Sequence, residues 1–345
     1  MNRLAIVLCF FISNVSAQAP YPPSTIITGA AWDTTTRLQF GAGSDQWPMT
    51  WAGDDHLYAA WGDGYGWNTN ESNDPKRSIG VTRIAGVAPH LSGTDTWGAG
   101  PGSSFGKPDA LVAFDSKLYM FWVNGDSRFD HDSYSAVSSD SGKTWTLGHE
   151  RIFRYAPPGF RVRGILQYGK DYAGAPDDYL YIYFGFNRHP DIYLARVRKD
   201  DIFDGDAYEW YAYTKPDGSA AWTDSFHRKS VVFHDDNGYL WHVGVSYNAG
   251  LKRYLLTKPH FDKHDNRDHI LADIAGLGIF EAPTPWGPWS TVFYQDDFLD
   301  GHVKFSFFIP TKFISSDGKS FWLAFSGWPE YDNVNFIKGR LIVRR

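Results

Sequence analysis

A fivefold repeat of short aromatic strands constrains this chain more than any other feature of its sequence. Each copy begins with a polar turn, continues with alternating aromatic and aliphatic residues, and ends in a polar loop. Successive copies are offset by 61, 62, 73 and 68 residues when they are aligned on one aromatic position, namely Tyr58, Tyr119, Tyr181, Tyr254 and Trp322. Alternation with a period of two is typical of β-strands. The sequence therefore predicts five similar β units.

Further β-like segments flank each aromatic strand. Apolar segments precede it at 49–53, 110–114, 164–168, 243–247 and 309–314, and a third set follows it at 78–84, 133–138, 191–196, 278–282 and 336–343. Several units have a fourth segment, as at 208–214 and 289–294. Four antiparallel strands repeated five times predict an all-β, five-bladed β-propeller. The alternative is a two-sheet sandwich or a pair of domains, which five matched units disfavour.

The last unit lacks an outer strand of its own. We expect residues 36–40, near the N-terminus, to supply that strand, because closing the ring removes the open edges of the first and last sheets. No linker or shift in composition marks a domain boundary. We therefore expect residues 18–345 to form one propeller domain.

Composition agrees with this fold and excludes several classes of protein. Of 345 residues, 43% are hydrophobic, 17% are aromatic and 21% are charged. Aromatic residues suit pleated sheets, whereas a helical bundle needs periodic Ala, Leu, Glu and Lys. The net charge of −6 offers no basic face to a nucleic acid.

The first 17 residues have the pattern of a secretory signal. Arg3 provides the basic start, residues 4–12 the apolar stretch, and residues 15–17 the small side chains of a cleavage site. The apolar stretch is too short to span a bilayer, and no other such run follows. We expect a secreted or periplasmic monomer without a membrane anchor. The one cysteine, Cys9, lies inside the signal, which leaves no disulfide.

One local motif supports the propeller. Residues 138–145, from Ser138 through Asp140 and Gly142 to Trp145, match the Asp-box pattern S-x-D-x-G-x-T-W. We expect it at a hairpin between outer strands, where Asp140 caps the turn and Trp145 packs between blades. Its role is structural.

The innermost strands of a propeller all begin at one end of the axis, which we call the entry face. The residues predicted to line it come from strand starts and from loops after second strands. They include Asp126, Arg128, Arg161, Arg188, His189, His260, His302, Ser306, Glu330 and Asp332, besides the residues assigned below. Carboxylates, cations and aromatic rings around one pocket suit a sugar, so the expected partner is a polysaccharide or an oligosaccharide.

Paired carboxylates are the machinery of glycoside hydrolysis. Asp45 and Asp109 occupy equivalent places in neighbouring units and are the predicted catalytic pair, with Asp63 as a residue that tunes them. The alternative is turn capping for Asp45 and Asp63 and a plain loop role for Lys107 and Asp109. The residues predicted to bind substrate are Gln46, Trp47, Lys107, His131, Gln167, Tyr247, Lys304 and Trp328.

Several motifs resemble one known family. They are residues 246–255 (SYNAGLKRYL), 282–289 (APTPWGPW), 44–48 (SDQWP), 61–64 (WGDG), 169–175 (GKDYAGA) and 193–197 (YLARV). Together they are similar to secreted five-bladed propellers first described as a domain of unknown function. Some members hydrolyse D-arabinan. The resemblance covers most of the chain and implies a glycan-active propeller, most specifically a glycoside hydrolase.

The sequence departs from the related arabinanase and invertase type at one position. Those enzymes carry an acidic proton donor on the third innermost strand, where this chain has Arg163. The departure leaves two alternatives open. In a polysaccharide lyase, Arg163 and Lys304 would neutralise a uronate while His131, His242 or Tyr247 removes its C5 proton. In a non-catalytic propeller, the same pocket would only bind sugar.

We expect no required cofactor. A Ca²⁺ ion on the propeller axis is left open. The polar run at residues 260–269 has no diagnostic metal-ligand spacing.

Overall fold

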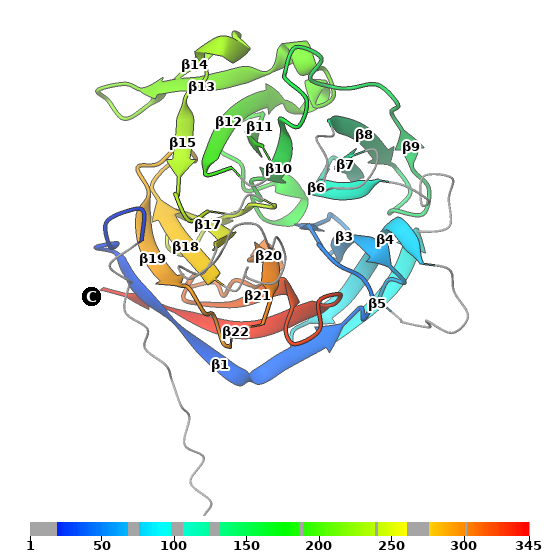
Figure 1. Ribbon diagram of the computed structural model, residues 1–345. Coiled ribbons are helices and arrows are strands. Elements are labelled where there is room, and N and C mark those ends of the chain that lie inside the picture. Colours follow the sequence, from blue (N-terminus) through cyan, green and yellow to red (C-terminus); the bar gives the residue numbers. More distant parts are fainter. Residues whose placement is uncertain are drawn as a thin grey trace, which may run out of the picture.

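The computed structural model describes residues 19–67, 76–97, 106–123, 132–186, 189–238, 241–260, 276–300 and 302–344. In these residues the chain forms five antiparallel sheets set around a central axis (Figure 1). The prediction of an all-β, five-bladed propeller is confirmed. The helical segments of the described chain are short 3-10 turns. Residues 1–17, the predicted signal, lie outside the described residues.

Each blade starts with an innermost strand and adds its strands outward. Blades one and two contain β2 (Met49–Trp51), β3 (Leu57–Gly64), β4 (Arg77–Val87) and β5 (His90–Trp97), then β6 (Lys107–Phe114), β7 (Lys117–Val123), β8 (Ser133–Ser138) and β9 (Thr146–Leu147). Blades four and five contain β16 (Gly244–Asn248), β17 (Arg253–His260), β18 (Gly276–Ala282) and β19 (Ser290–Gln295), then β20 (Lys304–Phe308), β21 (Ser320–Gly327), β22 (Val334–Val343) and β1 (Ile27–Phe40).

Blade three departs from the four-strand pattern. Its first three strands are β10 (Arg161–Ile165), β11 (Tyr179–Gly185) and β12 (Asp191–Arg198). Two separate strands then pair with β12, namely β13 (Glu209–Thr214) and β15 (Val231–His234). A further strand, β14 (Ala220–Thr223), pairs with β13, and this hairpin lies at the outer rim (Figure 1). The sheet therefore has six strands.

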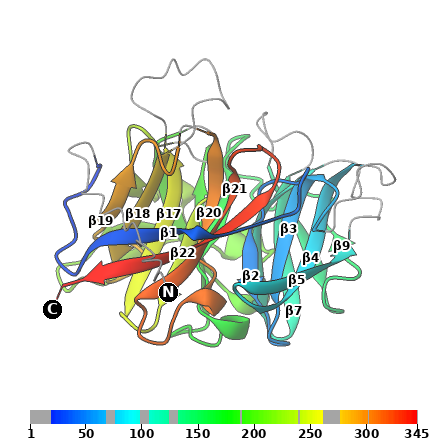
Figure 2. The ribbon, with the colours of Figure 1, turned by 90° about the horizontal axis from the view of Figure 1, so that it is seen from below.

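The N-terminal strand closes the ring, as predicted. Strand β1 pairs antiparallel with β22 from Ile27 opposite Val343 to Phe40 opposite Val334. Figures 1 and 2 show the two strands side by side, in blue and red. The closing strand is longer than the predicted residues 36–40 because it starts at Ile27.

The five repeat residues Tyr58, Tyr119, Tyr181, Tyr254 and Trp322 all lie on second strands. The prediction for the innermost strand of the fifth unit, residues 309–314, is wrong. The observed strand is β20 (Lys304–Phe308), and Thr311–Phe313 forms a 3-10 turn after Pro310. Lys304 and Ser306 interrupt the apolar pattern of β20 although both are fully buried.

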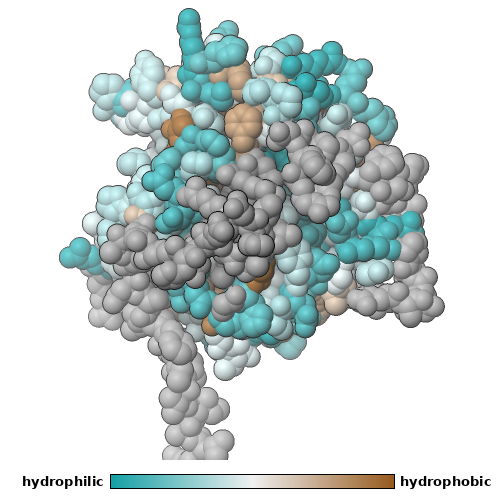
Figure 3. All heavy atoms as spheres, in the orientation of Figure 1, coloured by the Kyte–Doolittle hydropathy of each residue, from teal (hydrophilic) through white to brown (hydrophobic). Residues whose placement is uncertain are grey.

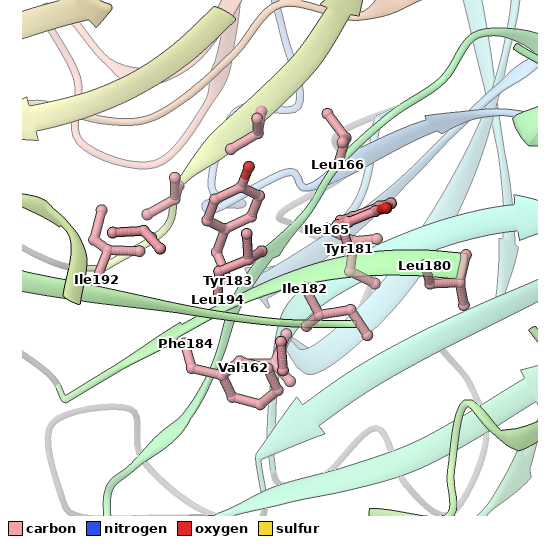
Figure 4. Close-up of a cluster of buried hydrophobic side chains, with 14 of the residues drawn as sticks. Val162, Ile165, Leu166, Leu180, Tyr181, Ile182, Tyr183, Phe184, Ile192 and Leu194 are labelled. Carbon is pink, nitrogen blue, oxygen red and sulfur yellow. The ribbon is translucent and has the colours of Figure 1, made fainter. Parts of the chain in front are cut away.

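Large apolar side chains fill the space within and between blades. In blade three, Val162, Ile182, Phe184 and Leu194 are completely buried and pack together (Figure 4). By contrast, the described surface visible in Figure 3 is mainly hydrophilic. In the described part of the chain, no helix has the length and apolar character needed to cross a bilayer.

The turn at residues 138–145 has the expected geometry. The Asp140 carboxylate accepts hydrogen bonds from the Thr144 backbone N–H (2.9 Å) and hydroxyl (2.6 Å). Trp145 lies 5.8 Å from Trp97 of blade one, between ring centroids. The hairpin thus links the outer strands of blades one and two.

Candidate functional site

The innermost strands bring most of the predicted site residues to the entry face. Asp45 pairs with Gly62 just before β2, Lys107 begins β6, and Lys304 begins β20. His242 precedes β16, and Arg163 lies in β10. Because all five strands run in the same direction along the axis, these residues share one end of the molecule.

The side chains of Asp45, Gln46 and Lys107 converge on Gly62. A methyl group at Gly62 would lie 3.0 Å from Asp45 Oδ1, 3.1 Å from Lys107 Cδ and 3.4 Å from the Gln46 amide carbon. Asp45 is only 5% exposed and Gln46 only 1%. Gly62 therefore leaves room for a closely packed polar group.

Three carboxylates act on one another at this point. Burial raises the pKa of Asp45 well above its usual value, and the nearby charges of Asp332 and Asp63 raise it further. Burial also raises the pKa of Asp332, which is opposed by Lys76 at 3.5 Å. A raised pKa favours the protonated form of a carboxyl group.

Asp63 differs from the other two carboxylates. Its side chain is about half exposed (51%) and its Oδ1 lies 2.5 Å from the ammonium group of Lys107. The Lys107 side chain is itself buried, at 8% exposure. The group therefore combines a proton-holding acid with an accessible carboxylate held by a cation, which is the division of roles that acid–base catalysis requires.

Several residues at this end of the axis have left-handed backbone angles although they are not glycine. Gln46 and Trp47 have φ angles of 78° and 56°, Asp63 has 43°, Ser306 has 54° and Trp328 has 66°. Such angles are unfavourable for residues other than glycine and are enriched at functional sites. Trp47 is 1% exposed, and its indole N–H donates to the Ser44 carbonyl, so it packs in the core rather than facing a ligand.

Asp109 is engaged by the next blade. Its Oδ2 lies 3.4 Å from Nε of Arg161, and both side chains are 2% exposed. Asp109 is the extra residue at an irregularity in the β6–β7 pairing, between Pro108 and Ala110. This geometry makes Asp109 a buried ion-pair partner that links blades two and three.

Arg163 and His242 are both tied to the protein. The guanidinium of Arg163 is fully buried and donates to the carbonyls of Gly185 (3.2 Å) and Trp241 (3.3 Å). His242 Nε2 donates to the Pro108 carbonyl at 3.1 Å, so Nδ1 accepts from the Ser306 hydroxyl at 2.8 Å. Burial lowers the pKa of His242 to about 3, which keeps it neutral.

The ammonium group of Lys304 likewise finds its hydrogen-bond partners within its own loop. Its ammonium group is buried and donates to the carbonyls of Asp300 and His302 and to the Asp300 carboxylate. Burial alone would raise the pKa of Asp300, but hydrogen bonds from Trp328, His302 and Lys304 lower it to about 2. Lys304 is therefore the centre of a loop cluster.

Trp328 belongs to the same cluster. Its indole N–H donates to Asp300, and the guanidinium of Arg37 lies 4.3 Å from its ring centroid. Arg37 also donates to the Trp328 carbonyl at 2.7 Å. Arg37 belongs to the closing strand β1 and covers one face of the Trp328 ring. The tryptophan therefore connects β1 to blade five.

Two of the predicted residues lie at the far end of the axis. Gln167 follows β10, and its amide donates to the carbonyls of Leu111 (3.1 Å) and Ile165 (3.2 Å). Tyr247 lies near the end of β16 and packs on Tyr168 and Tyr254. The structure therefore does not bring them to Asp45. His131, Asp126, Arg128 and Arg188 lie outside the described residues.

A small cavity lies between the innermost strands. It has a volume of about 20 Å³, room for about one water molecule, and is lined by Asp109 and Gln167 together with mainly apolar residues. The described residues contain no group of three or more His, Cys, Asp or Glu side chains that could hold a metal.

Other members of the entry-face group were harder to find from sequence. Asp332 was one of several polar residues predicted near this face, but nothing in its local sequence singled it out from Glu330. Lys76 and Arg37 were not predicted at all. Their roles depend on the placement of β4 beside blade five and of β1 beside Trp328, and no short motif reports such contacts.

Comparisons with solved structures give the same fold. The GH43_1 enzyme from Xanthomonas citri complexed with xylose is 12% identical, with a TM-score of 0.52 over 90% of this chain and 93% of that chain. The catalytic domain of Coprinopsis cinerea GH62 alpha-L-arabinofuranosidase is 11% identical, with a TM-score of 0.50 over 96% and 97%. At these identities the likeness concerns the fold alone.

Sequence comparison is more specific. No curated protein matches the chain. The model of the family described as "Domain of unknown function (DUF4185)" matches residues 33–337. That match runs from the closing strand β1 to β22 and so includes all five blades and the entry-face carboxylates. It confirms the resemblance drawn from the motifs, and the chain belongs to the DUF4185 family.

Proposed function

We propose that this protein is a glycoside hydrolase whose chemistry is carried out by the entry-face carboxylates. The observation that carries the proposal is the contrast between Asp45, a buried acid with a raised pKa, and Asp63, a half-exposed carboxylate paired with Lys107. Hydrolysis of a glycosidic bond needs a proton donor and a base or nucleophile. These two environments supply one of each.

The roles follow from the surroundings of each group. Asp45 is the proton donor to the leaving oxygen, since burial and the charges of Asp63 and Asp332 favour its protonated form. Asp63 is the base or nucleophile, and Lys107 fixes its orientation through the 2.5 Å ion pair. Asp332 maintains the raised pKa of Asp45.

This assignment changes the partner of Asp45 from the one predicted. Asp109 was the expected second carboxylate, but it is 2% exposed and lies 3.4 Å from Arg161. A carboxylate held by a buried guanidinium group is poorly placed to act as the reacting base. Asp63, expected only to tune the pair, has the exposure that the reacting carboxylate needs.

The fold comparisons add independent support for a carbohydrate partner. One neighbour in structure is named an arabinofuranosidase, and another was solved with bound xylose. Together with the family resemblance, this makes a polysaccharide or oligosaccharide the proposed substrate. We further propose that the signal of residues 1–17 is removed on export, which N-terminal sequencing of the secreted protein would test by a new start at Gln18.

The lyase alternative receives less support. It required Arg163 and Lys304 as cations for a uronate, yet Arg163 donates to two backbone carbonyls and Lys304 is enclosed by its own loop. His242, a candidate base, has both ring nitrogens engaged. A purely sugar-binding role would use the same carboxylates and is separated from hydrolysis by experiment.

The test is a panel of neutral and uronate-containing polysaccharides, assayed for new reducing ends and for the ultraviolet absorbance of unsaturated uronates. We expect reducing ends without that absorbance, and their loss in the Asp63→Asn variant. The matched control is Asp178→Asn, since the Asp178 side chain is 79% exposed on blade three. Binding of a glycan without turnover would overturn the hydrolase in favour of a sugar-binding propeller, and unsaturated products would establish a lyase.

A further inference from the structure

Two neighbouring side chains at the entry face have buried polar atoms without protein partners. Asp45 Oδ1 and both the oxygen and the nitrogen of the Gln46 amide are enclosed, and none has a hydrogen-bond partner among the described residues. Buried polar groups are almost always satisfied by protein, ordered water or ligand. A cluster of three unsatisfied atoms therefore indicates a bound group.

The unsatisfied atoms belong to side chains that crowd around Gly62, which has no side chain of its own. The three side chains of Asp45, Gln46 and Lys107 approach the position that a Gly62 side chain would occupy to within 3.0–3.4 Å. We call these four residues the Gly62 notch. Any side chain at Gly62 would intrude on the carboxyl and the amide at once.

The backbone holds the Gln46 amide in this place. Gln46 and Trp47 are consecutive residues with left-handed φ angles of 78° and 56°. The Gln46 N–H donates to the Ser326 hydroxyl at 3.0 Å, which ties the turn to blade five. Backbone angles of this kind persist where the surrounding structure fixes the residue.

We propose that the Gly62 notch binds a neutral hydroxyl group, which is a water molecule in the free protein and a hydroxyl of the glycan in the complex. The second half of this proposal rests on the proposed glycan hydrolysis, whereas the first does not. Gln46 is the residue that determines the position of the bound hydroxyl.

The chemistry of the notch favours a hydroxyl over an ion. An amide both donates and accepts hydrogen bonds, and a protonated carboxyl does the same; the raised pKa of Asp45 favours that protonated form. A cation would be repelled by Lys107, and an anion by Asp63 and Asp332. A hydroxyl, which also donates and accepts, matches the whole set.

The first experiment needs no substrate. A high-resolution crystal structure of the free protein is expected to contain an ordered water within about 3.2 Å of the Gln46 amide and the Asp45 carboxyl. The water is expected to be missing in Gln46→Leu and in Gly62→Ala, where the added methyl occupies the notch. An empty notch in the wild-type protein would overturn the proposal.

The second experiment measures binding of the glycan that is turned over. Gln46→Leu is expected to lower kcat/KM by about tenfold or more, the loss typical of one well-placed hydrogen bond. Its melting temperature is expected to stay the same or rise, since the amide has no described protein partner to lose. Gln39→Leu, at an exposed position of β1, is the control.

The outcomes separate the two proposals. A lower melting temperature with an unchanged kcat/KM would make Gln46 a structural residue and overturn the notch. If an ordered water remains in the glycan complex and the kinetics of Gln46→Leu are unchanged, the notch binds only water. That result would overturn the second half of the proposal, in which a glycan hydroxyl replaces the water. If the panel gives no turnover with any glycan, the proposed function fails while the crystal structures still decide the first half.

Discussion

The start of blade one and the starts of blades four and five are equivalent places in the repeat, but their polar groups are satisfied in opposite ways. At blade one, Asp45 and Gln46 keep buried atoms without described partners. At blades four and five, His242 and Lys304 direct their polar atoms to carbonyls, a hydroxyl and a carboxylate of the protein itself. Under the proposed function, one repeat position serves chemistry on one side of the axis and structure on the other.

The difference shows that polarity at the centre of a propeller is not by itself a sign of a binding site. A buried cation with saturated hydrogen bonds holds loops and blades together, as Lys304 does with Asp300. A buried acid with a raised pKa and an unsatisfied oxygen, as at Asp45, does not hold loops or blades together in this way. Perturbed groups of this second kind are the ones that mark functional sites.

The largest expected effect is on activity at blade one. Asp63→Asn removes the accessible carboxylate while keeping its size, so we expect kcat to fall by about 10²–10⁴-fold. Stability should also fall, by about 1–2 kcal/mol, because the buried ammonium group of Lys107 loses its charged partner. Turnover kinetics and thermal unfolding of the same preparation check both parts. Full activity in this variant would show that Asp63 is not the reacting carboxylate, and blade one would then not differ in function from the other blades.

The next largest effect is on stability at blade five. Lys304→Met leaves two carbonyls and part of the Asp300 carboxylate without their donor, so we expect a loss of about 2–3 kcal/mol in the free energy of unfolding. The Asp300 side chain is 41% exposed, which allows water to replace part of the lost contact. Denaturant titration measures the change. Unchanged stability combined with lost glycan binding would make Lys304 a ligand group and break the comparison.

A smaller effect is expected at blade four. His242→Leu leaves the Pro108 carbonyl and the Ser306 hydroxyl unpaired, which should cost about 1–2 kcal/mol at pH 7. The cost should shrink as the pH falls. The folded state keeps His242 neutral down to a pKa of about 3, whereas the unfolded state takes up a proton below about pH 6.5 and so gains stability. Unfolding of both proteins between pH 4 and pH 7 checks this; a cost that grows on acidification would show that folded His242 is charged.

The fold was predictable because its signal is repeated and local. Tyr58, Tyr119 and Tyr181 sit in the same alternating pattern, and each repeat reports independently on one blade. The innermost strands were the weak point: the third, predicted at 164–168, is Arg161–Ile165, and the fifth was missed. Lys304 and Ser306 look like loop residues, because their partners Asp300 and His242 belong to a loop and to another blade.

The site was predictable in its position but not in its pairings. Strand starts meet at one end of any propeller, so Asp45 and Lys107 were expected there. Which acid meets which cation depends on the rotation between neighbouring blades, and hence Asp109 was not expected to pair with Arg161. Gln167 was misplaced because β10 begins at Arg161 and has already ended at Ile165.

The measurement that tests the central claim most directly is the pH dependence of unfolding for Asp45→Asn. A carboxyl with a raised folded-state pKa keeps its proton when folded and loses it when unfolded above about pH 4, so the wild-type protein should lose stability as the pH rises through that window. Asparagine carries no such penalty. We predict that Asp45→Asn is inactive and is more stable than wild type at pH 8, with the difference vanishing towards pH 4. A variant that is less stable than wild type at pH 8 would mean that the protein stabilises a charged Asp45, and it would contradict the account of Asp45 as a proton-holding acid.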